Sequence, residues 1–217
     1  MLDAESSDDT VAVARAHGAR VETRPWRSFV AARRYALARV ETPWTLMLDA
    51  DELPDAALRA AISRAPGDVD GYCLRRVTAL CGVSVRTAGW SSESLLRLFR
   101  TGRARIEANS VGGGADLHER WIVDGRTGEL PGTILHSSYP TLAAYRAKFE
   151  RYTSIEAAAL APSRRALARE LALFPVRVVW SLAKYGGWRD GWRGLYVAWQ
   201  SARYRVVVRA KALRNPR

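Results

Sequence analysis

The feature that most constrains the fold is an apolar run that ends in a cluster of acidic residues. The run covers residues 44–48 (Trp-Thr-Leu-Met-Leu), and Asp-Ala-Asp-Glu follows at 49–52, before Leu53 and Pro54. A short apolar segment bounded by a turn signal is typical of a buried strand. Because side chains at i and i+2 of an extended segment project to the same face, we expect Asp49 and Asp51 to point the same way. The pattern therefore predicts two carboxylates at the carboxyl end of a buried strand.

Helix and strand patterns alternate along the first two thirds of the chain. Such alternation predicts an α/β fold with a mostly parallel, Rossmann-like sheet flanked by helices. In sheets of this kind ligands bind beyond the carboxyl ends of the strands, which makes the acidic edge a candidate site. We expect helices at about 11–17, 29–40, 54–64 and 141–161, strands at 20–24, 44–48, 72–77 and 95–99, and a hairpin that pairs 121–123 with 133–135.

The C-terminal part of the chain differs in composition from the rest. Residues 164–217 contain 13 lysines and arginines but two acidic residues, whereas residues 1–163 contain 21 basic and 20 acidic residues, so the net charge of +12 is concentrated at the end. The same segment contains four of the eight tryptophans. We therefore predict two domains, 1–162 and 163–217, the second a basic helical appendage. Its helices are expected at about 165–184 and 195–213, with Pro175 kinking or restarting the first.

Cysteine content and hydropathy restrict the class of protein. Cys73 and Cys81 are the only cysteines among 217 residues, too few for a disulfide framework or a cysteine zinc site. The N-terminal residues do not form a signal peptide, and there is no run of 18 or more apolar residues for a membrane span. We therefore expect a cytoplasmic protein.

Several segments, in order along the chain, match the motifs of one family. They are DAESSDDT at 3–10, RRYAL at 33–37, LDADE at 48–52, GWSSESLLRLFR at 89–100, LHER at 117–120 and LHSSY at 135–139. The corresponding family motifs are D-S-G-S-T-D-G-T, R-N-F-A-L, L-D-A-D-E, G-W-x-P-D-x-x-L-R-L-F-R, V-H-E and L-H-Y-S-Y. On these segments the chain resembles bacterial family 2 glycosyltransferases with a GT-A fold, in particular the lipopolysaccharide-core biosynthesis type.

The sequence differs from the family motifs at several positions. Glu5 and Asp9 stand where the family usually has glycine, Arg34 replaces its asparagine, and Glu93 stands where aspartate is common. From this resemblance we expect the family's first strand, with its nucleobase contacts, to be missing from this sequence. An inactive or truncated transferase-like fragment therefore stays open as an alternative.

The resemblance implies transfer of a sugar from a nucleotide-diphosphate donor, assisted by Mg²⁺ or Mn²⁺. A divalent ion neutralises the charge that builds up on the departing diphosphate. Asp51 is implied as the primary metal ligand, and Asp49 as a ligand of the ribose or of the same metal. Asp3 would accept a hydrogen bond from the base, and Arg33 would pair with a phosphate oxygen. His118 is a further candidate metal ligand, although a lone histidine is often only structural.

The acceptor hydroxyl needs a general base. Family 2 enzymes are inverting, so the resemblance implies a single carboxylate and no covalent intermediate. Glu93 occupies the acidic position before L-R-L-F and is our candidate base, with Glu119 as the alternative base. Glu93 could instead be a surface carboxylate that pairs with Arg97. Trp90 could stack on the acceptor sugar or belong to the core.

The basic, aromatic C-terminal segment suits the surface of a membrane. Cationic residues are attracted to anionic lipid, and aromatic rings favour the headgroup layer. We expect peripheral binding to the cytoplasmic face of the inner membrane, where a glycolipid or saccharide acceptor would be used. An ordinary solvated basic face is the alternative. A nucleic-acid-binding protein is the remaining alternative, but nucleic acid is not expected, because the body's carboxylates would repel its phosphates.

Overall fold

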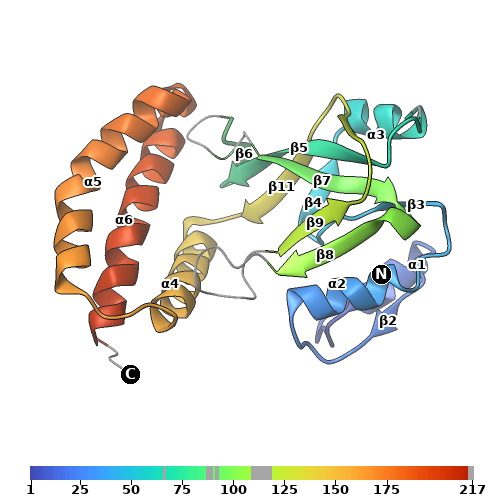
Figure 1. The fold of residues 1–217 in the computed structure, drawn as a ribbon, viewed down its shortest axis with the longest axis horizontal. Coiled ribbons are helices and arrows are strands. Elements are labelled where there is room, and N and C mark those ends of the chain that lie inside the picture. Colours follow the sequence, from blue (N-terminus) through green and yellow to red (C-terminus); the bar gives the residue numbers. More distant parts are fainter. Residues whose placement is uncertain (66, 87–89, 91–92, 109–118, 215–217) are drawn as a thin grey trace.

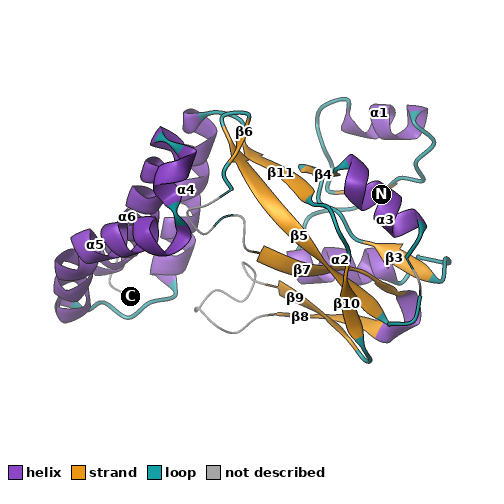
Figure 2. Ribbon diagram, turned by 90° about the horizontal axis from the view of Figure 1, so that it is seen from above, coloured by secondary structure: helices purple, strands orange, loops and turns teal. Residues whose placement is uncertain are grey.

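A computed structural model describes the chain except for residues 66, 87–89, 91–92, 109–118 and 215–217. It contains a sheet region, formed by the first 139 residues, and a bundle of three helices beside it (Figures 1 and 2). This arrangement confirms the predicted α/β class, in which helices flank a central sheet.

The sheet region contains three sheets. Strands β1 (Leu2–Asp3) and β2 (Glu22–Thr23) form a small parallel pair. The seven-stranded central sheet has the order β3-β7-β5-β11-β4, and β6 and β10 also pair with β5. Its strands are β3 (Trp44–Leu46), β4 (Glu52–Pro54), β5 (Gly71–Leu80), β6 (Val83–Ser84), β7 (Glu93–Arg100), β10 (Thr127–Glu129) and β11 (Ile134–Tyr139). A third, antiparallel sheet pairs β8 (Ala104–Ala108) with β9 (Glu119–Val123).

The central sheet is mixed rather than purely parallel. β5 pairs in parallel with β10 and β11, but β3–β7, β5–β7, β5–β6 and β4–β11 are antiparallel pairs. Parallel neighbours need a crossover of a dozen or more residues, usually a helix. In the described part of the chain only β6 lies between β5 and β7, so these long strands run back along each other.

The predicted hairpin between residues 121–123 and 133–135 is wrong. β9 pairs with β8, whereas β11 pairs with β5 and β4. The two segments contribute to different cores: Trp121 packs with Phe99 and Ile106, and Ile134 packs with Leu58. Burial in two separate cores therefore decides which strands these segments pair with, and the turn signal between them does not.

Each face of the central sheet is covered by a helix. Helix α3 (Ala56–Ser63) packs on one face in a cluster made by Leu58, Val69, Tyr72, Leu74, Leu98 and Ile134. Helix α2 (Phe29–Leu37) adds Val30 and Leu37 to the cluster around Phe99. Because adjacent residues of a strand face opposite ways, Leu98 and Phe99 on β7 contribute to the two different cores. Helix α1 (Thr10–Ala16) joins β1 to β2 and has no buried residue.

The three long helices pack on one another and on the end of β5. They are α4 (Leu142–Ala158), α5 (Arg164–Tyr185) and α6 (Trp192–Arg214), and α5 runs through Pro175 as one helix. A cluster of Leu80, Val85, Tyr145, Phe149 and Val197 joins α4 and α6 to the sheet region. Short 3₁₀ helices occur at Thr101–Arg103 and Gly187–Asp190. Within the described residues, no helix is both long and apolar enough to cross a membrane.

Candidate active site

Asp49 and Asp51, which follow β3, lie in a turn and not in an extended segment, and Glu52 begins β4. The N–H of Glu52 donates to the carbonyl oxygen of Asp49 over 3.0 Å, and the N–H of Asp49 donates to Oε2 of Glu52, also over 3.0 Å. These two bonds close the turn between β3 and β4. The same-face rule for extended residues therefore does not apply to Asp49 and Asp51, and their carboxylates have separate partners.

Asp49 is held by two arginines. Its Oδ1 accepts a hydrogen bond from Arg33 over 2.6 Å, and its Oδ2 accepts one from Arg97 over 3.0 Å. Burial alone would raise the pKa of Asp49, but the charges and hydrogen bonds of Arg97 and Arg33 outweigh burial and lower this pKa. The carboxylate is thus ionised and electrostatically neutralised by its neighbours.

Asp51 is the more accessible of the two aspartates, with a side chain that is 37% exposed. Its Oδ2 lies 3.2 Å from Nε2 of His136 on β11 and 3.9 Å from the Lys148 ammonium on α4. The hydrogen bond from His136 is the main cause that lowers the pKa of Asp51, and the Lys148 charge lowers it further against the opposing effect of burial. Thr78 on β5 contacts Nδ1 of His136 over 3.1 Å.

Glu52 is buried and linked to both sides of the site. Its Oε1 accepts hydrogen bonds from Arg97 over 2.8 Å and from Arg76 over 3.1 Å. Arg76 also donates to Glu93, the candidate base, with Nε 3.0 Å from Oε2. Together with the contacts of Asp49, these bonds form a continuous chain of alternating charges that runs Glu93–Arg76–Glu52–Arg97–Asp49–Arg33.

Glu93 lies at the start of β7 with its side chain 48% exposed. Its ion-pair partner is Arg76 on the neighbouring strand β5, and not Arg97, with which the alternative interpretation had paired it. Burial would lower the pKa of Arg76, but the charges and hydrogen bonds of Glu93 and Glu52 raise it. Arg76 is therefore a permanent cation between the candidate base and the acidic turn.

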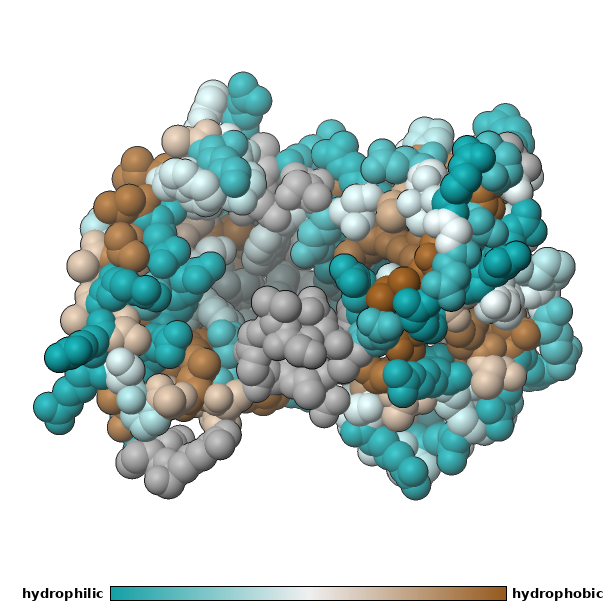
Figure 3. Space-filling model, viewed as in Figure 1, coloured by the Kyte–Doolittle hydropathy of each residue, from teal (hydrophilic) through white to brown (hydrophobic). Residues whose placement is uncertain are grey.

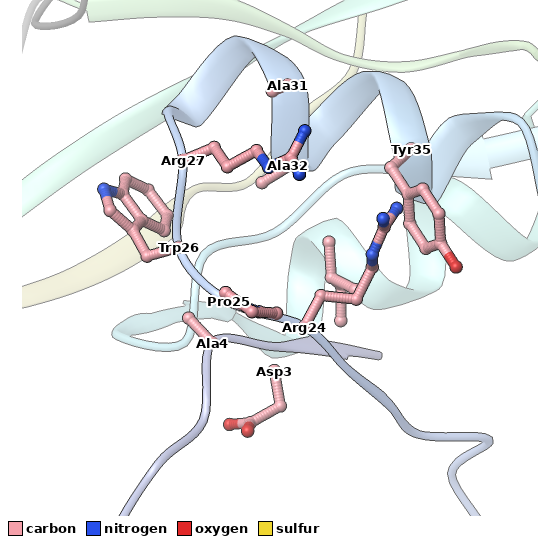
Figure 4. Close-up of a pocket in the computed structure, with 10 residues that line it drawn as sticks. Asp3, Ala4, Arg24, Pro25, Trp26, Arg27, Ala31, Ala32 and Tyr35 are labelled. Atoms are coloured by element: carbon pink, nitrogen blue, oxygen red, sulfur yellow. The ribbon is translucent and has the colours of Figure 1, made fainter.

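Asp3 lies apart from this chain of charges and lines a cavity of about 190 Å³ between β1, residues 24–27 and α2. Figure 4 shows Arg24 against the ring of Tyr35, with the Asp3 carboxylate turned away from both. The carboxylate accepts hydrogen bonds from the hydroxyl and the N–H of Ser6, which lower the pKa of Asp3. Helix α2 lies between this cavity and the acidic turn, because its Tyr35 lines the cavity while its Arg33 contacts Asp49.

Two predicted site residues are not placed by the structure. His118, the further metal candidate, lies outside the described residues. Glu119, the alternative base, begins β9 with its backbone, but its side chain is outside the described part. Trp90 belongs to the core between α4 and the sheet region, with its ring 5.1 Å from that of Tyr139.

Four side chains that the sequence interpretation assigned no role line the acidic turn: Glu52, Arg76, His136 and Lys148. Glu52 had a signal, since it completes the Asp-Ala-Asp-Glu sequence. His136 also had a signal, as the histidine of the LHSSY segment at 135–139. Arg76 and Lys148 had none, because they reach the turn from β5 and α4 through contacts that span many residues.

The described residues fit a metal ion that is shared with a donor, and not one enclosed by protein. Among them, no group of three or more histidine, cysteine, aspartate or glutamate side chains is arranged to hold a metal ion. Mg²⁺ commonly keeps several waters and is bound by one or two carboxylates plus substrate phosphates. The accessible carboxylate of Asp51, with the imidazole of His136 beside it, fits this mode. Asp49 fits less well, because both of its oxygens accept hydrogen bonds from arginine.

Comparison with known proteins adds independent information. The profile of glycosyl transferase family 2 matches residues 1–115. The lipopolysaccharide core biosynthesis glycosyltransferase LpsC of Rhizobium meliloti (strain 1021) is 25% identical over 222 residues, which cover 97% of this chain and 80% of that protein. An uncharacterized glycosyltransferase of Rickettsia conorii is 42% identical over 52 residues, which cover 24% of this chain and 18% of that protein. Because the profile covers more than half of the chain, the chain belongs to glycosyl transferase family 2 and is a glycosyltransferase.

Proposed function

We propose that the chain is an inverting, metal-dependent glycosyltransferase that moves a sugar from a nucleotide-diphosphate donor to a lipopolysaccharide-core or other lipid-linked glycan. The observation that carries the proposal is the position of Arg76, which contacts both Glu52 of the acidic turn and Glu93, the candidate base. A donor-binding carboxylate and a base at one site are what such a transfer needs. The name of the Rhizobium relative supports the acceptor class.

Asp51 is the proposed metal ligand, with His136 next to it and His118 as a further candidate. A bound Mg²⁺ or Mn²⁺ would supply Lewis-acid neutralisation of the diphosphate leaving group. Asp49 is proposed to contact the donor ribose or to share the metal. Since Arg33 and Arg97 neutralise Asp49, the acidic turn presents less negative charge to an approaching diphosphate than its sequence suggests.

Glu93 is the proposed general base. In an inverting displacement the acceptor oxygen bonds to the anomeric carbon as the bond from that carbon to the diphosphate oxygen breaks, and the acceptor proton moves to the carboxylate. Arg76 donates two hydrogen bonds to Oε2 of Glu93, which orients the carboxylate. Glu119 is kept as the alternative base.

Asp3 and Arg33 are the proposed contacts to the donor base and phosphate. Arg33 would exchange part of its contact with Asp49 for a phosphate oxygen, a bidentate partner that arginine suits. We propose that the protein works peripherally at the anionic, cytoplasmic face of the inner membrane, where a lipid-linked acceptor is available, and that it does not bind nucleic acid.

Donor binding tests the proposal directly. The melting temperature would be measured with UDP, GDP, ADP or CMP, each with and without Mn²⁺, for the wild type and Asp51→Ala. Stabilisation by one nucleotide that needs Mn²⁺ and disappears in Asp51→Ala is expected, because a ligand that binds only the folded state raises its stability. The absence of a shift with every nucleotide would contradict the proposal.

The base assignment needs its own measurement. Glu93→Gln should reduce the transfer rate by about 10²–10⁴-fold, the usual contribution of a general base, and leave the nucleotide-induced shift unchanged. Glu107→Gln is a suitable control, because Glu107 is an exposed glutamate on β8 paired with Arg105. Normal turnover by Glu93→Gln would exclude Glu93 as the base.

A further inference from the structure

Helix α5 exposes several apolar side chains on its outer face. Val176, Val179 and Trp180 are 60%, 67% and 54% exposed, and Leu171 is 54% exposed. Ala172, Val176, Val179 and Trp180 are spaced by three or four residues and lie along one exposed stripe of the helix, whereas Leu171, five residues before Val176, lies outside it. Hydrophobic residues gather along the outer edge of α5, at the left of Figure 3 and away from the sheet region.

The opposite face of α5 holds a charged pair. Glu170 is 4% exposed, and its carboxylate lies 3.1 Å from the guanidinium of Arg177, about two helical turns further along α5. Helices of water-soluble domains place charges outward and apolar side chains inward. In α5 a charged pair faces inward while a stripe of apolar side chains is exposed, which indicates that its outer face has an apolar environment.

Tryptophans and cations surround this stripe. Trp188, Trp192 and Trp199 are about half exposed or more, and the ring of Trp199 packs edge-on against Phe174 of α5. Basic groups lie over the exposed rings, with Lys184 4.4 Å from the Trp180 ring and Arg193 4.6 Å from the Trp192 ring. Tryptophan next to a cation is a side-chain combination that favours the headgroup layer of a membrane.

The charge of this region selects an anionic surface. Arginines stand at the start of α5 (Arg164, Arg165 and Arg169), and Lys184 and Arg189 stand near its end. Glu170 and Asp190 are the only acidic residues in 164–217; Glu170 is buried, and Asp190 accepts a hydrogen bond from the N–H of Arg86. A nucleic acid would meet an apolar stripe where it needs cations. A lipid surface meets apolar groups at the centre and cations at both ends.

We propose that α5 lies flat in the headgroup layer of an anionic bilayer, with the stripe formed by Ala172, Val176, Val179 and Trp180 inserted toward the acyl chains. Helix α6 and the short helix at 187–190 border this contact with Trp188, Trp192 and Trp199. The orientation follows the behaviour of interfacial amphipathic helices, in which apolar burial and attraction to anionic lipid act together. The link to a lipid-linked acceptor rests on the proposed function; the lipid contact itself does not.

Vesicle binding by the full-length chain tests this contact. Sedimentation with vesicles of phosphatidylglycerol and phosphatidylcholine would be compared with sedimentation with phosphatidylcholine alone. The test variant is Val176→Ser/Val179→Ser/Trp180→Ser. The matched control, Val13→Ser/Val83→Ser/Trp26→Ser, changes the same residue types at exposed positions of the sheet region. Circular dichroism and the melting temperature would verify that both variants fold.

The wild type and the control should bind the anionic vesicles equally, and the test variant about tenfold or more weakly, because apolar burial carries a large part of interfacial binding. Wild-type binding should fall without phosphatidylglycerol. Equal binding by the test variant and the wild type would overturn the proposal. So would wild-type dimers that the test variant abolishes without any vesicle binding, because the stripe would then cover a second copy of the chain.

Asp51→Ala separates this proposal from the proposed function. It should bind vesicles like the wild type although it no longer responds to nucleotide. Vesicle binding by a wild-type chain that shows no nucleotide response would remove the proposed function and leave the lipid contact standing. A nucleotide response without vesicle binding would remove the lipid contact and leave the proposed donor binding standing.

Discussion

Two glutamates are buried in the part of the chain that the structure describes, and their surroundings differ. Glu52, in the sheet region, has both carboxylate oxygens satisfied: Oε1 accepts from Arg76 and Arg97, and Oε2 accepts from the N–H of Asp49. Glu170, in the helical bundle, is near Arg169 and Arg177, but its Oε2 has no hydrogen-bond partner among the described residues. Two buried carboxylates can therefore differ in how completely they are hydrogen-bonded.

This difference in hydrogen bonding accompanies a difference in how the two regions distribute apolar and charged side chains. In the sheet region apolar side chains fill two cores, and the buried Glu52 and Arg97 belong to one hydrogen-bonded chain at the acidic turn. In α5 a stripe of apolar side chains is exposed, whereas the Glu170–Arg177 ion pair faces inward. A fully hydrogen-bonded network fixes geometry, which suits a site. A loosely bonded pair is a weaker structural element.

The largest effect is expected for Glu52→Ala. The change leaves Arg76 and Arg97 without their shared carboxylate, and breaking a buried ion pair costs about 3–5 kcal/mol of unfolding free energy. Chemical denaturation would measure the loss. Glu107→Ala, at an exposed ion pair, is the control and should cost about 1 kcal/mol or less. A loss for Glu52→Ala as small as that of the control would contradict the view that this glutamate organises the site.

A smaller loss is expected for Glu170→Ala. Its partner Arg177 has a side chain that is 31% exposed and can turn toward solvent, so the cost should be nearer the 1–3 kcal/mol of a lost buried hydrogen bond to a charged group. The same denaturation experiment measures it. A cost equal to that of Glu52→Ala would remove the distinction between the two glutamates.

The smallest effect is expected for the pH dependence of the melting temperature when Asp49 is replaced. Arg97 and Arg33 overcome the effect of burial and lower the pKa of Asp49 below its ordinary 3.8. A lowered native pKa contributes stability that is present above the unfolded pKa and is lost as pH falls through the native value. The melting temperature of Asp49→Asn should therefore fall less steeply than that of the wild type as pH drops below about 4. Parallel curves for the two proteins would show that Asp49 is not held by this charge pairing.

Much of the fold follows from local sequence patterns. The helices at 142–158, 164–185 and 192–214 agree with the periodicity and punctuation that predicted them, to within a few residues. The family follows from short motifs along the chain. The hairpin between 121–123 and 133–135 was wrong because its turn signal is local, whereas pairing is decided by burial of Trp121 and Ile134 in different cores.

The sequence by itself determined the α/β class, the acidic cluster at 49–52 and the concentration of charge after residue 163, and it predicted Glu93 as the candidate base. Only the tertiary structure showed that the acidic residues lie at a turn, that Asp49 and Asp51 have different partners, that Glu52 is linked to Glu93 through Arg76, and that an apolar stripe of α5 is exposed. Helix and strand patterns depend on residues a few positions apart. The partners of Asp51 and Glu52 come from β5, β7, β11 and α4, and it is the packing of these elements that brings them together.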